Sequence, residues 1–188
     1  MIPVIDKASI LSENEKKELG MYIIENCKCN IQDVDWLKHI IIRDDGLTDY
    51  AGYWTISLSK QDDCTHKFKT AIILNSRYLR SIASFKRVLA HEYGHNWTLG
   101  YLYHLERIND HFQDKAPKLY YRIRRLSYAN FKPDYSREWK YCDKEVMAED
   151  YRILFTNNKT SHKMKGLIGN PSTEVASYLS MLGKQKWQ

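Results

Sequence analysis

The stretch that decides the fold is Val88-Leu89-Ala90-His91-Glu92-Tyr93-Gly94-His95-Asn96-Trp97. Within it, His91, Glu92 and His95 match the pattern H-E-x-x-H. On a helix, two histidines four residues apart project from one face and can bind a single zinc ion. Glu92 directly follows the first histidine, so it is placed to take a proton from a metal-bound water. The stretch therefore predicts a helix that carries a metal site.

The residues on either side favour a helix that is covered on two faces. At about 100° per residue, one face is apolar and consists of Ile82, Phe85, Leu89 and Tyr93. The two histidines fall on roughly the opposite face, together with Val88, Leu99 and Leu102. Histidines on an ordinary surface would lie among charged residues instead. We predict a central helix over about residues 81–99, with Gly100 as its stop signal.

Length and composition indicate a globular protein. The chain has 188 residues, of which 43% are hydrophobic and 28% charged, so we expect one domain over residues 1–188. No run of about 18 apolar residues exists that would span a membrane, and no secretory signal is recognisable at the N-terminus. We expect a monomer, with the cytoplasm as the default compartment and export by another route left open. The four cysteines are too few for a disulfide scaffold and are expected to be reduced thiols.

The net charge of +6 is unevenly placed. Between positions 115 and 140 the basic residues are Lys115, Lys118, Arg122, Arg124, Arg125, Lys132, Arg137 and Lys140. Tyrosine, phenylalanine and tryptophan residues are interleaved with them, a composition that suits nucleic acid or an acidic peptide. A solvated helix and loop with long side chains lying along apolar surface is the simpler interpretation, because no nucleic-acid motif accompanies the segment.

The rest of the chain predicts a small mixed sheet followed by helices. Ser12 and Glu15 form a capping box that opens a helix reaching about residue 27. Three strands are expected at 37–42, 53–58 and 70–74. After the central helix we expect helical pieces near 102–112 and 116–127, an irregular segment around 130–141, and an apolar helix over about 143–155 with Asp143 as N-cap. Asn170 and Pro171 are expected to begin a closing helix that ends at Gly183. The fold class is α+β.

A catalytic zinc ion usually has three protein ligands and one open position, so a third donor is expected after the central helix. Glu145 and Glu149 are the candidates, because they lie one turn apart on the apolar 143–155 helix. Two buried carboxylates need partners: zinc would satisfy one and a histidine N–H the other. The alternative is a structural pair neutralised by Arg152, which lies on the same face of the helix.

With these motifs the sequence resembles the zincin metallopeptidases of gluzincin type, most closely the catalytic domain of anthrax lethal factor and the Pro-Pro endopeptidases. Their pattern is H-E-aromatic-G-H, then E-x-x-A-E several tens of residues later, followed by an aromatic residue and arginine. This chain has His91-Glu92-Tyr93-Gly94-His95 and, after 49 intervening residues, Glu145-Val146-Met147-Ala148-Glu149, then Tyr151-Arg152. The resemblance covers about residues 70–156, the expected catalytic core.

The resemblance implies a role for each matching residue. His91, His95 and Glu145 would bind zinc, with Glu149 as the alternative third ligand. Glu92 would act as general base and then protonate the leaving amine. Glu149 would otherwise orient a ligand histidine.

The family also implies a tyrosine shortly before the ligand glutamate, which stabilises the oxyanion on the scissile carbonyl. The usual spacing of seven residues falls here on Glu138. Tyr135 and Tyr141 lie on either side of it, and Tyr135 is favoured because it lies in an irregular segment able to reach over the cleft. A packing role for either tyrosine remains an alternative.

The resemblance further implies that the strand before the central helix lies at the sheet edge and pairs with an extended peptide substrate. That strand contains Ala71, Ile72, Ile73 and Leu74. The leading hypothesis is a zinc-dependent endopeptidase that acts on a protein or peptide. The alternatives are a nucleic-acid-associated protein, such as a protease recruited to DNA, that uses the basic 115–140 segment, or a zincin-like module without activity that serves in interaction.

Overall fold

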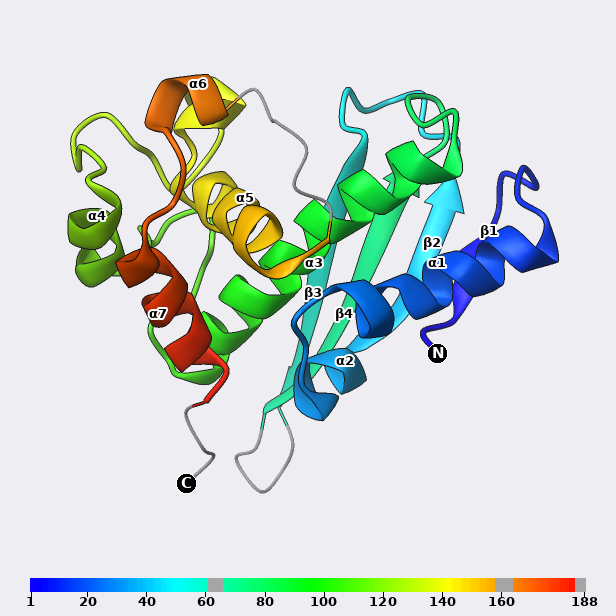
Figure 1. Cartoon of the computed structure of the whole chain (residues 1–188), viewed down its shortest axis with the longest axis horizontal. Helices are drawn as coiled ribbons and strands as arrows, with labels where there is room; N and C mark the ends of the chain where they lie inside the picture. Colours follow the sequence, from blue (N-terminus) through cyan, green and yellow to red (C-terminus); the bar gives the residue numbers. More distant parts are fainter. Residues whose placement is uncertain (61–65, 158–163, 185–188) are drawn as a thin grey trace.

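The computed structural model describes residues 1–60, 66–157 and 164–184, and in this part of the chain a small sheet precedes a helical C-terminal half (Figure 1). The four-stranded sheet has the order β1-β2-β4-β3. Its strands are β1 (Val4–Asp6), β2 (Leu37–Arg43), β3 (Gly52–Lys60) and β4 (His66–Asn75). β1, β2 and β4 are parallel, whereas β3 is antiparallel to β4. The prediction of a mixed α+β fold is confirmed.

The helices begin and end at identifiable signals. They are α1 (Glu13–Asn26), α2 (Ile31–Trp36), α3 (Ile82–His104), α4 (Lys118–Arg124), the 3₁₀ helix η1 (Trp139–Tyr141), α5 (Asp143–Phe155), α6 (Lys165–Ile168) and α7 (Thr173–Leu182). The capping box of Ser12 and Glu15 is formed at the start of α1 as predicted. Two predicted N-caps are wrong by one or two residues: Cys142 rather than Asp143 caps α5, and Ser172 rather than Asn170 caps α7.

The central helix is longer than predicted, because Gly100 does not end it. α3 continues to His104, so no separate helix covers residues 102–112. A Cβ atom at Gly100 would lie 2.7 Å from Cζ3 of Trp36. The glycine therefore permits a tryptophan of α2 to pack directly on the helix, and its small size serves packing rather than termination.

The prediction that residues 71–74 form the sheet edge is wrong. Ala71, Ile72, Ile73 and Leu74 pair with β2 on one side and with β3 on the other. β4 is therefore an inner strand whose backbone groups are already hydrogen-bonded. β3 returns antiparallel to β4 and takes the outer position beside α3, so the sheet edge on this side belongs to residues 52–60.

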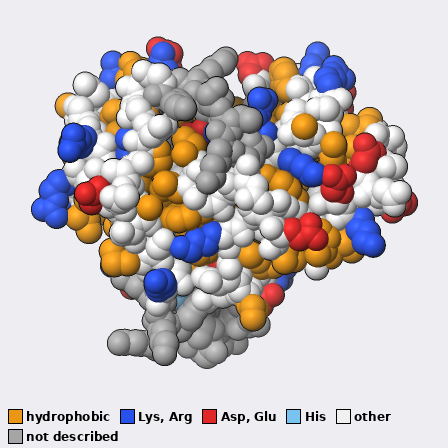
Figure 2. Space-filling view, viewed as in Figure 1, with side chains coloured by type: hydrophobic (Ala, Val, Ile, Leu, Met, Phe, Trp, Pro, Cys, Tyr) orange, Lys and Arg blue, Asp and Glu red, His pale blue; other side chains and the backbone are white. Residues whose placement is uncertain are grey.

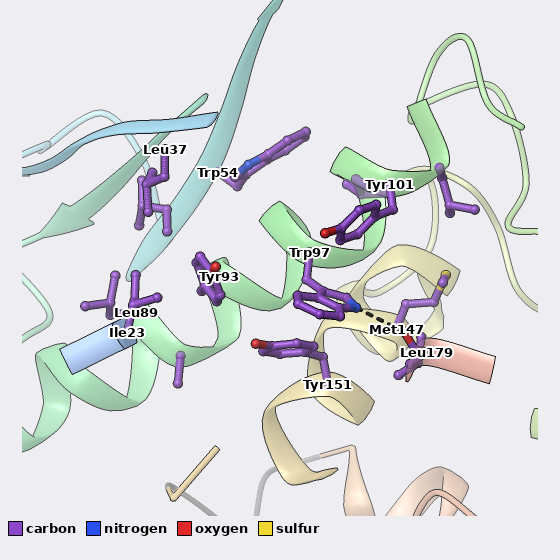
Figure 3. Packing of buried hydrophobic residues seen from close by; sticks show 14 of the residues in the cluster. Ile23, Leu37, Trp54, Leu89, Tyr93, Trp97, Tyr101, Met147, Tyr151 and Leu179 are labelled. Carbon is purple, nitrogen blue, oxygen red and sulfur yellow. Dashed lines mark hydrogen bonds between the residues drawn. The ribbon is translucent and has the colours of Figure 1, made fainter. Parts of the chain in front are cut away.

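α3 forms the centre of the core, with contacts to the sheet on one side and to α5 on the other. Figure 3 shows Tyr93, Trp97 and Tyr101 projecting from α3 among residues of neighbouring elements. The Trp97 ring lies 5.5 Å from that of Tyr151 in α5, and its Nε1–H donates to the Leu179 carbonyl of α7 at 3.1 Å. The predicted two-sided cover of this helix is confirmed.

α3 and α5 approach each other closely at a glycine. A Cβ atom placed on Gly94 would lie 2.5 Å from the carbonyl oxygen of Ala148 and 2.9 Å from its Cα. Both neighbours are backbone atoms, which cannot move aside as a flexible side chain would. The small residues at positions 94 and 148 therefore set how near the two helices lie, and with it the distance between the side chains they carry.

Two further observations concern membrane-spanning helices and the thiols. None of the helices in the described ranges combines the length and apolar character needed to cross a membrane. Cys27, Cys29 and Cys142 are free thiols, and Cys64 lies outside the described residues.

Candidate metal centre

Three potential metal ligands from two helices meet in one buried cluster. His91 and His95 come from α3 and Glu145 from α5, and one ligand atom of each lies within 4.8 Å of the others. Nε2 of His91 is 2.9 Å from Oε2 of Glu145, and Nε2 of His95 is 3.3 Å from Oε1. The residues are only 8%, 7% and 4% exposed. The structure thus brings Glu145, and not Glu149, to the two Nε2 atoms.

Glu149 lies behind the cluster, one turn further along α5. Its Oε2 is 3.2 Å from Nδ1 of His91, and both of its oxygens accept hydrogen bonds from Arg152, at 2.6 and 2.9 Å. A carboxylate at Nδ1 fixes the orientation of the ring and directs Nε2 toward the cluster. The two roles considered for Glu149, a partner of histidine and a partner of Arg152, are therefore combined in one carboxylate.

The histidines and carboxylates of the cluster stabilise one another's charged forms. Burial lowers the pKa of His91, but hydrogen bonds to Glu145 and Glu149 outweigh it and raise the pKa to about 10. Burial also acts to raise the pKa of Glu145, yet the charge of His95 and the hydrogen bonds from both histidines hold it well below its usual value.

Glu92 lies between α3 and the edge strand. Burial raises its pKa, while the nearby charges of His95 and His91 lower it, as does a hydrogen bond with the backbone of Trp54 in β3. A Cβ atom at Gly52 would lie 3.3 Å from Cγ of Glu92. The carboxyl group is thus held beside the metal-ligand cluster and against the open edge of the sheet.

Of the two candidate tyrosines, the structure places Tyr135 at the cluster. Its hydroxyl donates a 2.6 Å hydrogen bond to Oε1 of Glu145. Burial and the neighbouring Glu145 charge raise the pKa of Tyr135, so the phenol keeps its proton. Tyr141 instead packs against Phe131, with ring centroids 5.8 Å apart, and against Arg137.

One aromatic residue at the cluster is absent from the sequence-based predictions. The ring of Trp139 stacks on that of His91, with centroids 6.4 Å apart and an angle of 19° between the planes. It belongs to η1, in the segment expected to be irregular. Because this segment has no helical or strand periodicity, the sequence contains no signal for the direction of its side chains.

The donor set fits a divalent transition metal. Two imidazole nitrogens and one carboxylate oxygen are the ligands typical of a catalytic zinc site, which leaves one position open. Nδ1 of His95 is buried and has no hydrogen-bond partner among the described residues, so only its Nε2 takes part in the cluster.

Comparisons with protein families, with curated proteins and with solved structures found no match to this chain. The functional argument therefore depends on the geometry of the cluster and on the sequence motifs.

Proposed function

We propose that the protein is a zinc-dependent endopeptidase of zincin type. The observation that carries the proposal is the convergence of His91, His95 and Glu145, with Glu92 beside the first ligand on the same helix. A buried set of two nitrogen donors and one oxygen donor, with a neighbouring carboxyl group, is the arrangement that metal-assisted hydrolysis requires. A purely structural site would have no use for the carboxyl group of Glu92 at this position.

Each residue has a defined task in this proposal. His91, His95 and Glu145 would hold the zinc ion, which supplies Lewis-acid activation of the scissile carbonyl and of water. Glu92 takes the proton of the attacking water and delivers it to the leaving amine. The hydroxyl of Tyr135 donates a hydrogen bond to the oxygen on which negative charge develops. Glu149 keeps His91 in the required orientation.

The edge strand β3, not β4, is the element on which a peptide substrate would pair. Asn75 of β4 donates its backbone N–H to the carbonyl of Ala51 at 2.9 Å. Because alternate residues of a strand face opposite sides in the hydrogen-bonding plane, Tyr53 also faces β4, whereas Gly52 and Trp54 face the open edge. The backbone of Trp54 forms a hydrogen bond with Glu92, so this edge lies beside the proposed base.

The test is metal analysis of the purified protein combined with digestion of a peptide library. We expect about one zinc ion per chain, cleavage of internal peptide bonds, loss of cleavage with a chelator and recovery when zinc is added. His95→Ala should remove both metal and cleavage, whereas His39→Ala, an exposed histidine of β2, should affect neither. Purified protein that binds no metal, or cleavage that survives the chelator, would refute the proposal.

The nucleic-acid interpretation has less support. Several cations of the 115–140 segment lie over nearby tyrosine rings: Lys115 is 3.9 Å from the Tyr128 centroid and Arg137 is 4.7 Å from that of Tyr141. Each of these rings therefore already has a cation as a neighbour. On the face shown in Figure 2, basic and acidic side chains are interspersed among hydrophobic ones rather than gathered into one basic patch.

A further inference from the structure

Three exposed aromatic rings from three separate loops meet beside the metal-ligand cluster. Tyr50, Phe112 and Tyr135 are 45%, 50% and 41% exposed, respectively. The ring centroids of Tyr50 and Tyr135 are 5.9 Å apart, and those of Phe112 and Tyr135 are 6.3 Å apart. We call these three residues the aromatic rim. Large apolar side chains that remain exposed in a contiguous group are typical of a binding surface.

The rim is in direct contact with the metal-ligand cluster through Tyr135. Tyr135 belongs both to the rim, through its ring, and to the cluster, through its hydroxyl bond to Glu145. On the other side, the Phe112 ring lies tilted against that of His111 with centroids 4.1 Å apart, and His111 packs edge-on against Trp54 of β3 at 5.8 Å. The rim therefore connects the segment preceding α5 with the open edge strand.

The loop that carries Tyr50 is fixed by one buried side chain. Oδ1 of Asn75 accepts hydrogen bonds from the backbone N–H groups of Asp45 and Arg77, both at 3.1 Å. Its Nδ2 donates to the carbonyls of Asp45 and Tyr50, at 2.9 and 3.2 Å. Asn75 thus uses its whole amide group to hold both ends of the 45–50 loop. Tyr50 is exposed on an anchored backbone.

The loop that carries Phe112 is anchored to a similar degree. The hydroxyl of Tyr103 accepts from the backbone N–H of His111 at 3.0 Å and lies 2.7 Å from its Nδ1. The backbone N–H of Phe112 donates to Oδ1 of Asp110 at 2.7 Å. Rings held in this way lose little further conformational freedom when they bind a partner, which favours affinity.

We propose that the aromatic rim determines the specificity of the enzyme, and that this surface binds a bulky hydrophobic side chain of the substrate next to the scissile bond. This inference rests on the proposed peptidase function. A peptide paired with the edge of β3 would extend alternate side chains away from the sheet. A substrate side chain that lies over Glu92 would contact the rim, because Tyr135 covers the Glu145 side of the cluster.

A nucleic acid base is the other ligand that stacks on exposed aromatic rings. The charges near the rim disfavour it, because each ring lies within two residues of an aspartate: Asp49, Asp110 and Asp134. Hydrogen bonds from Ser136 lower the pKa of Asp134, which keeps that carboxylate charged. Carboxylates at these positions repel phosphate groups, whereas a hydrophobic side chain is indifferent to them.

The test uses two peptide hydroxamates that bind zinc through the same group and differ in one side chain, phenylalanine in one and glycine in the other. Affinities for the full-length, zinc-loaded protein are measured by calorimetry, and kcat/KM is measured for the matching pair of cleavable peptides. We expect the phenylalanine compound to bind about tenfold more tightly. Tyr50→Ala and Phe112→Ala should each reduce this ratio to near one, and Tyr50→Phe should retain it, because the ring and not the hydroxyl is recognised.

Tyr128→Ala is the matched control, since Tyr128 is 51% exposed but packs on Tyr121. It should leave the ratio unchanged. Equal binding of the two hydroxamates by the unaltered protein, or a ratio unaffected by both rim substitutions, would overturn the inference. So would tight binding of a single-stranded oligonucleotide that is lost in Tyr50→Ala. Binding of the hydroxamates requires bound zinc but no cleavage. If the protein distinguishes the two hydroxamates but cleaves no peptide, the peptidase proposal fails while the inference about the rim stands.

Discussion

The hydroxyl of Tyr135 lies 2.6 Å from Oε1 of Glu145, ten residues further along the chain, although one belongs to a loop and the other to a buried helix. The carboxylate oxygens of Glu145 also contact the Nε2 atoms of His91 and His95, so the phenol is directed at the centre of the cluster. A proton donor in this position can serve the carboxylate at rest and a substrate oxygen during reaction.

Tyr135→Phe removes this donor while it keeps the ring. We expect kcat to fall by about 10²-fold with a small change in KM, because a donor to the oxyanion acts mainly in the transition state. Zinc content should stay the same. Steady-state kinetics with the best library peptide check this, and Tyr141→Phe serves as control because Tyr141 packs against Phe131 instead. An unchanged kcat would assign Tyr135 a packing role only.

Glu92→Gln separates metal binding from catalysis. Glutamine has nearly the same shape but cannot accept the proton of water, so we expect turnover to fall by about 10²–10⁴-fold. Metal content and thermal stability should be retained, since Glu92 is not among the three ligands. Metal analysis and peptide cleavage on the same preparation provide the measurement. A variant that cleaves at the native rate would remove Glu92 from the mechanism.

Gly94→Ala should force α3 and α5 apart, because the added Cβ would meet the backbone of Ala148 at 2.5 Å. We expect a loss of roughly 1–3 kcal/mol in the free energy of unfolding and a weaker affinity for zinc, since the ligands come from both helices. Urea unfolding and competition with a zinc-binding dye measure the two effects. Gly166→Ala is the control: the structure leaves open space around its Cβ position, so stability should not fall.

The lowered pKa of Glu149 predicts a specific dependence of stability on pH in the metal-free protein. Burial raises its pKa, but hydrogen bonds from Arg152 and His91 outweigh this and lower the pKa from 4.5 to about 2. The folded state therefore binds this proton less readily than the unfolded state. Its contribution is fully present above pH 4.5 and is lost as the pH falls toward 2, with an upper bound of about 3 kcal/mol.

Glu149→Gln should accordingly be less stable than the unaltered protein at pH 7, and the difference should shrink between pH 4.5 and pH 2. Urea unfolding at several pH values in the presence of a chelator measures it. Glu25→Gln, which alters an exposed carboxylate of α1, should follow the unaltered protein throughout. A constant difference between Glu149→Gln and the unaltered protein at all pH values would contradict the assigned pKa.

The residues of the candidate site can be predicted from the sequence where their proximity depends on local spacing. The interval between His91 and His95 follows from one turn of a helix, and the proximity of Glu145 was accessible through the second motif. The position of β4 was not accessible, because the order of strands depends on long-range pairing that local periodicity does not encode. The role of Gly100 is not predictable for a related reason: its contact with Trp36 joins residues 64 positions apart.

Trp139, whose ring lies parallel to that of His91, gives the protein an intrinsic optical probe. Indole emission is sensitive to the charge and protonation of a stacked neighbour, so replacing the proton of His91 with a metal ion should change the fluorescence of this tryptophan. Metal loading could then be followed in real time without a label, and the part of the emission change that comes from this residue should be absent in Trp139→Phe.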